Sequence, residues 1–93
     1  VPTQSLTSLN SEFFNKQSRL LAERLRKEAG ERPQDQVQLG VRLVSLRQPS
    51  DAEIRRCLHL LGDLQQKDGL SAEAAMNAVC LMMLNLNEFV YLD

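Results

Sequence analysis

Histidine and cysteine are scarce in this sequence, and their scarcity excludes several kinds of reactive site. His59 is the only histidine, so the chain holds neither a histidine-rich zinc site nor a catalytic histidine pair. The two cysteines, Cys57 and Cys80, are too few for a disulfide scaffold and wrongly spaced for a CxxC motif or a CxxCH haem attachment site. We therefore predict no catalytic, cofactor-binding or metal-ligating residue, and we do not expect an enzyme.

Long apolar runs and an excess of charge of one sign are also missing. The longest apolar run, Ala78 to Leu84, ends at Asn85 and is far shorter than the roughly 20 residues that cross a bilayer. The net charge of −1 gives no overall field that would attract nucleic acid or an anionic membrane surface. We expect neither membrane insertion nor nucleic-acid binding. Because the chain starts at Val1 with no signal-peptide pattern, we interpret it as a piece of a longer protein.

What is present is the composition of a folded domain. The hydrophobic fraction of 43% and the charged fraction of 25% are close to globular averages, and 93 residues are enough for one domain. The apolar residues recur at helical spacing, and short polar segments with glycine or proline separate the periodic stretches. We predict a single all-α domain over residues 1–93.

The first long helix is predicted over Glu12 to Ala29, with Asn10 and Ser11 as capping residues and Gly30 as its end. Its expected buried face consists of Phe13, Phe14, Leu20, Leu21 and Leu25, with Gln17 and Ala22 at the edges. The opposite face carries the i,i+4 pairs Glu23–Lys27 and Arg24–Glu28 within a basic cluster of Arg19, Arg24, Arg26 and Lys27. We interpret that cluster as a solvated helix face; binding of an acidic partner is the alternative.

Two further helices follow, each with a recognisable start. Pro33 suits the first turn of a helix that runs to about Leu46, and Gly40 inside it predicts a close helix crossing. Ser50 and Glu53 form a capping box, in which each side chain satisfies a backbone amide that the helix leaves unpaired. The third helix is predicted to end near Gly69.

The C-terminal helix is capped by Ser71 and is apolar around nearly its whole circumference from Ala74 to Leu86. It is therefore predicted to be the central element of a four-helix up-and-down bundle. Folding back around Gly69 puts Cys57 and Cys80 at nearly the same height; we expect buried free thiols, with a disulfide as the alternative. The aromatic end of the chain is a possible interaction surface, formed by Phe89, Tyr91 and Leu92.

Three stretches resemble a planctomycete domain of unknown function: LNSEF at Leu9 to Phe13, RQPSDAE at Arg47 to Glu53, and LNLNEFVYLD at Leu84 to Asp93. That family typically forms the C-terminal region of large exported proteins, many of which carry cytochrome c-like domains. The resemblance implies a C-terminal segment in the cell envelope or exterior, and no catalytic residues come with it. The sequence departs from the family pattern in having Leu46 where glycine is usual and Gln48 where a second proline is usual.

Complete helix signals without reactive groups favour a structural or protein-interaction module. Its partners would be other domains of the parent protein or a separate protein. The alternative is an accessory segment that buttresses an enzyme or electron-transfer protein whose reactive groups lie upstream. The activity of any parent protein stays unknown from the sequence.

Overall fold

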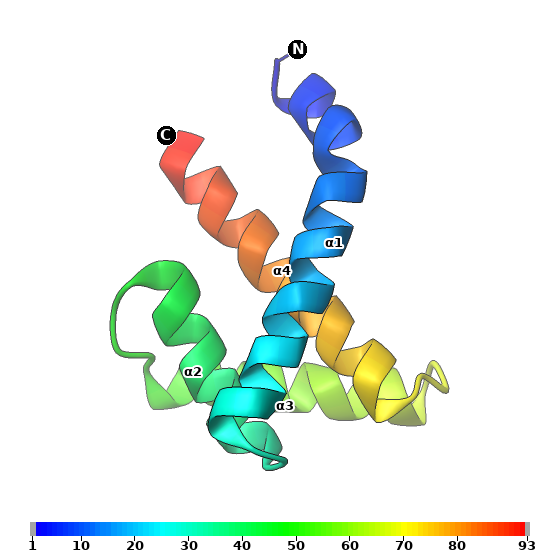
Figure 1. Cartoon of the computed structure of the whole chain (residues 1–93), viewed down its shortest axis with the longest axis vertical. Coiled ribbons are helices and arrows are strands. Elements are labelled where there is room, and N and C mark those ends of the chain that lie inside the picture. Colours follow the sequence, from blue (N-terminus) through cyan, green and yellow to red (C-terminus); the bar gives the residue numbers. More distant parts are fainter. Residues whose placement is uncertain (1, 93) are drawn as a thin grey trace.

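The computed structural model consists of four helices joined by short connections, in the part of the chain that it describes (Figure 1). They are α1 (Pro2–Ala29), α2 (Pro33–Ser45), α3 (Asp51–Gln66) and α4 (Ala72–Leu92). The structure describes the backbone of residues 2–92 and the side chains of residues 12–85. No strand occurs among the described residues, and the prediction of an all-α, four-helix fold is confirmed.

Helix α4 is the central element. It packs on α1, α2 and α3, whereas α1 and α3 do not pack on each other within the described residues. In Figure 1, α1 and α4 cross, and α3 lies across the end of the bundle where α1 ends and α4 begins. The all-round apolar pattern of the C-terminal stretch therefore indicated its position correctly, because such a helix has partners on several sides.

One hydrophobic core joins all four helices. Helix α4 supplies the largest share of it, including Val79 and Cys80, whose side chains are fully buried. The buried apolar residues are Ala22, Leu25, Val37, Val41, Cys57, Leu61, Ala75, Met76, Val79, Cys80 and Met83.

Glycines and capping residues end and start the helices as predicted. Gly30 follows α1 with φ +85° and Gly69 follows α3 with φ +70°, values that glycine adopts without a steric penalty. Ser71 accepts a hydrogen bond at its Oγ from the amide of Ala74, 3.1 Å away, and so caps α4. The side-chain amide of the buried Gln36 donates to the carbonyl of Gly30, which fixes the turn between α1 and α2.

The predicted start of the first helix was wrong. Helix α1 begins at Pro2 and not at Glu12, so Asn10 and Ser11 lie inside a helix of 28 residues. Proline is well tolerated in the first turn, where its missing N–H has no intrahelical acceptor. Asn and Ser lower helix propensity by only a few tenths of a kcal/mol each, so a pair of them does not force a break.

The predicted buried face of this helix was wrong in part. The structure buries Ser18, Ala22 and Leu25, whereas Phe13 and Leu20 are 56% and 49% exposed. The buried positions are spaced by four and three residues and face α2 and α4. Phe13 and Leu20 are seven residues apart and form a separate stripe that none of the described side chains covers.

The prediction of a close helix crossing at Gly40 is confirmed. A Cβ atom at this position would lie 3.1 Å from both Leu25 Cδ1 of α1 and Met83 Sδ of α4. Real Cβ atoms rarely approach neighbours so closely. A side chain here would need Leu25 and Met83 to shift by a few tenths of an ångström, so glycine suits the point where α2 meets α1 and α4.

Leu46 ends α2 in the left-handed conformation, with φ 60° and ψ 29°. Its amide donates to the carbonyl of Arg42 over 2.9 Å, and its side chain is 78% exposed. A leucine in this region of φ/ψ space costs about 1 to 2 kcal/mol relative to glycine. A glycine at this position would avoid that cost.

Replacing Leu46 with glycine is expected to raise the free energy of unfolding by about 1 kcal/mol, because glycine adopts the left-handed conformation without steric conflict. Urea unfolding followed by circular dichroism measures the change. Leu46→Ala is the matched control, since it removes the exposed side chain and keeps the strained backbone. An equal gain from alanine would show that the backbone conformation is not the cause.

Candidate functional site

The described side chains able to do acid–base or nucleophilic chemistry include two separate pairs, His59 with Asp63 on the surface of α3 and Cys57 with Cys80 in the core. His59 is 78% exposed at its side chain on α3, and its Nδ1 lies 3.3 Å from a carboxylate oxygen of Asp63 one turn later. This is a surface pair on one helix, as expected for a histidine flanking an apolar stripe. Among the described residues, no three His, Cys, Asp or Glu side chains gather to hold a metal ion.

Both cysteines are buried free thiols in the core between α3 and α4. Burial raises the pKa of Cys57, and it raises the pKa of Cys80 to about 12, with a smaller contribution from the neighbouring Cys57. A thiol with such a pKa carries almost no thiolate at neutral pH and is a poor nucleophile. The expected state, free thiols rather than a disulfide, is the one in the structure.

Two further predictions concern membrane crossing and the interaction surface near the C-terminal end. None of the helices, over the described residues, is long and apolar enough to cross a membrane. The possible interaction surface at Phe89, Tyr91 and Leu92 lies outside the residues whose side chains the structure describes, so it stays a prediction.

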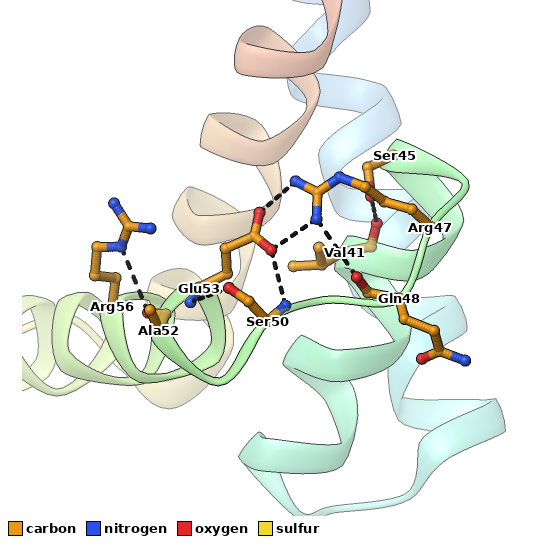
Figure 2. A network of polar contacts seen from close by, with 8 residues as sticks. All are labelled: Val41, Ser45, Arg47, Gln48, Ser50, Ala52, Glu53 and Arg56. Atoms are coloured by element: carbon orange, nitrogen blue, oxygen red, sulfur yellow. Dashed lines mark hydrogen bonds and ion pairs between the residues drawn. The ribbon is translucent and has the colours of Figure 1, made fainter.

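A polar network fixes the connection between α2 and α3 (Figure 2). The amide of Ser50 donates to Glu53 Oε1 over 2.9 Å, and the amide of Glu53 donates to Ser50 Oγ over 3.2 Å, which confirms the capping box. Arg47 adds a bidentate ion pair to the same carboxylate, at 2.8 Å from Nη1 to Oε1 and 2.5 Å from Nη2 to Oε2. Arg47 also donates to the carbonyl of Gln48.

The network explains the electrostatics of Glu53. The guanidinium of Arg47, followed by the backbone amide of Ser50, lowers the pKa of Glu53 to about 2. The side chain of Glu53 is 24% exposed, and that of Arg47 is 56% exposed, so solvent screens part of this interaction. The arrangement is a structural clamp on the loop between α2 and α3.

Glu53 is expected to make stability depend on pH between about 4.5 and 2. Its carboxyl has a lower pKa in the folded chain than its ordinary value of 4.5, so the folded state is favoured above pH 4.5. This stabilisation is lost as the pH falls towards 2. After solvent screening, we expect the lowered pKa of Glu53 to contribute about 1 kcal/mol to the free energy of unfolding at neutral pH. Glu53→Gln is expected to remove this contribution.

Urea unfolding at several pH values tests this expectation. Glu31→Gln is the matched control, because Glu31 is exposed and takes part in no ion pair among the described residues. The two variants are compared for the drop in stability between pH 5 and 2. Equal drops in Glu53→Gln and wild type would show that the clamp does not contribute.

The remaining candidate is the outer face of α1, which we define as Phe13, Lys16, Arg19 and Leu20. All four residues are exposed. The ring of Phe13 contacts that of Phe14 edge to face, with centroids 5.7 Å apart and an interplanar angle of 72°. This contact helps to hold the Phe13 ring in place. Two large apolar side chains on one stripe of a helix are typical of a surface that contacts protein.

The basic residues of α1 differ in whether they form ion pairs with glutamates. In its C-terminal half, Arg24 pairs with Glu28 at 2.5 Å and Lys27 with Glu23 at 3.2 Å, as predicted. No ion pair among the described residues involves Lys16 or Arg19. Lys16 and Arg19 therefore lie beside the exposed apolar stripe without a carboxylate partner among the described residues. The other described cations that take part in no ion pair are Arg26, Arg32, Arg42, Arg55 and Arg56.

Sequence reasoning missed this face because it assigned Phe13 and Leu20 to the core. Their separation of seven residues was a usable signal, since it defines a stripe distinct from the one through Ser18, Ala22 and Leu25. It also missed Arg47 as a partner of Glu53. A spacing of six residues across a loop has no helical period, so no local pattern indicates that pair.

Comparison with known proteins gives one match. Residues 1–61 match the sequence model of the family described as Protein of unknown function (DUF1553). The matched range includes the motifs at Leu9 to Phe13 and Arg47 to Glu53, and it does not include the ending at Leu84 to Asp93. Neither a curated protein nor a solved structure matches the chain.

Proposed function

The chain belongs to the family of proteins of unknown function DUF1553, and from this premise we propose that it is a helical protein-interaction module of a larger protein and not itself an enzyme. The observation that carries the proposal is the outer face of α1. Its two large apolar residues, Phe13 and Leu20, are 56% and 49% exposed on one stripe of the same helix, whereas the other exposed large apolar residues of the described range, Leu46 and Leu70, stand singly in the connections between helices.

The energetics of that face support the proposal. Leaving the side chains of Phe and Leu half in water forgoes roughly 1 kcal/mol each relative to burying them fully. Single exposed apolar residues are common, but two on the same stripe of one helix, about 10 Å apart along its axis, can contact the same partner. Covering this stripe by another protein would recover the hydrophobic free energy that the isolated domain does not use.

The proposed parent protein and cellular location of the module rest on the family resemblance. The motifs at Leu9 to Phe13 and Arg47 to Glu53 support placing it in a large exported planctomycete protein, in the cell envelope or outside the cell. Its contacts would then be with other domains of that parent protein or with a separate protein. Cytochrome c-like domains are candidates for such neighbours, because the resembling proteins often carry them.

Site-specific photo-crosslinking tests the proposal. A benzophenone-bearing phenylalanine is placed at position 13 of the natural full-length protein, and in a control at position 56, where Arg56 is exposed on α3. An interaction module predicts a crosslink of defined mass from position 13 and none from position 56. A crosslink to another segment of the same protein identifies a neighbouring domain, and one to a second protein identifies a partner. No crosslink from position 13 would contradict the proposal.

A further inference from the structure

The outer face of α1 combines apolar and basic side chains in a fixed register. Phe13 and Leu20 are seven residues apart, and Lys16 and Arg19 lie between them along the helix. A separation of seven residues is about two helical turns and keeps both apolar side chains on the same stripe. The basic side chains are spaced by three residues, so they also lie on one side of the helix.

The surface beside this stripe is hollowed. An open depression of about 550 Å³ is lined by Glu12, Phe13, Asn15, Lys16 and Arg19. One side chain of this lining is apolar, two are cationic and one is a carboxylate. A group that enters the depression therefore meets the Phe13 ring together with two cationic side chains and the single carboxylate of Glu12.

Local charge supports an acidic occupant. Between residues 12 and 20 the basic residues are Lys16 and Arg19 and the only acidic residue is Glu12, which gives a local net charge of +1 in a chain whose overall charge is −1. Further along α1 each of Arg24 and Lys27 already has a glutamate within 4 Å. Lys16 and Arg19 have no such partner among the described residues, so a carboxylate that approaches the apolar stripe can pair with both of them.

A helix is the shape that suits this register. Two helices that pack along their length place apolar residues of each in contact and flank them with charged pairs, as in coiled coils. A two-turn stripe is short, so the contact area is small and binding is weak unless other contacts of the module add to it. Carboxylates beside the seam would pair with Lys16 and Arg19 and fix the partner's orientation.

We propose that the outer face of α1 binds an acidic amphipathic helix of a partner protein segment, with apolar side chains of that helix on Phe13 and Leu20 and carboxylates on Lys16 and Arg19. This inference rests on the proposed interaction function and adds the chemical class of the partner. An interaction module could equally bind a neutral or basic partner, so the acidic charge of the partner is what this inference adds.

A pair of synthetic helical peptides tests the partner's charge. Both have about 20 residues and leucine at the same heptad positions; one carries Glu and the other Lys at the flanking positions. Binding to the intact chain is measured by fluorescence anisotropy. We expect the acidic peptide to bind at least tenfold more tightly, and its advantage to shrink as the salt concentration rises from about 50 to about 500 mM.

Substitutions then locate the binding surface. Lys16→Glu with Arg19→Glu is expected to abolish the preference for the acidic peptide, and Leu20→Ser is expected to weaken the binding of both peptides. Arg55→Glu with Arg56→Glu is the control, because it makes the same charge change at exposed positions of α3. A thermal melt followed by circular dichroism confirms that each variant is folded.

The outcomes separate this inference from the proposed function. If both peptides bind equally and Leu20→Ser weakens both, the interaction face stands and the acidic partner is wrong. A preference for the acidic peptide that persists in the Lys16→Glu, Arg19→Glu variant also overturns the inference. If neither peptide binds at about 1 mM, the acidic helix is wrong, and the crosslink from position 13 decides the proposed function separately.

Discussion

Replacing Leu25 with alanine is expected to lower the free energy of unfolding by about 3 to 4 kcal/mol. Leu25 is fully buried on α1, in contact distance of the α2–α4 crossing at Gly40. Truncation removes the transfer free energy of three carbon atoms and leaves a cavity that helices on several sides prevent from collapsing. Because a domain of this size is stable by only about 5 to 15 kcal/mol, the variant would lose a large part of its stability.

Urea unfolding measured by circular dichroism tests this value, and Leu20→Ala is the matched control. Leu20 lies on the same helix but is 49% exposed, so its truncation is expected to cost about 0.5 kcal/mol or less. The pair also checks the assignment of the two faces of α1. Equal costs for Leu20→Ala and Leu25→Ala would contradict the burial that separates them.

Replacing Gly40 with valine is expected to lower the free energy of unfolding by about 2 to 3 kcal/mol. A Cβ atom alone would lie 3.1 Å from Leu25 Cδ1 and Met83 Sδ, and valine adds two methyl groups to it. The side chains of α1 and α4 would have to leave their packed positions to make room. The loss exceeds the few tenths of a kcal/mol that valine gains over glycine in helix propensity.

Gly62→Val on α3 is the control for this substitution, because a Cβ atom at Gly62 would meet no atom within 4 Å. We expect Gly62→Val to be neutral or slightly stabilising. Thermal and urea unfolding of the two variants measures the difference directly. A similar change in stability for both would mean that the helix crossing at Gly40 does not determine the effect.

Leu25 and Gly40 are also expected to couple. Leu25→Ala removes Cδ1, one of the two atoms nearest to an added Cβ at Gly40. Gly40→Ala should therefore be more favourable in the Leu25→Ala background than in wild type, by about 1 kcal/mol in a double-mutant cycle. Additive effects would indicate that Met83, and not Leu25, limits the space at the crossing.

The family match does not supply a function for this chain. Its description assigns no activity, and among the described residues no three His, Cys, Asp or Glu side chains gather to hold a metal ion. The outer face of α1 combines two half-exposed apolar side chains with two cationic side chains that have no ion-pair partner among the described residues.

The sequence by itself determined the features that depend on neighbouring residues. The capping box of Ser50 and Glu53, the cap at Ser71 and the stops at Gly30 and Gly69 were all predictable. Each follows from hydrogen bonds or backbone preferences within a few residues of the chain. The central position of the C-terminal helix was also predictable, because its own sequence is apolar around nearly the whole circumference.

Only the tertiary structure decided which side of α1 is buried and what holds the loop before α3. Helices α2 and α4 select the stripe through Ala22 and Leu25, and no local pattern ranks it above the stripe through Phe13 and Leu20. Arg47 reaches Glu53 because the connection folds back on itself. Local capping indicated the starts of α3 and α4 but not that of α1. Burial and long-range pairing depend on how the helices pack, and for this chain the candidate site is a product of that packing.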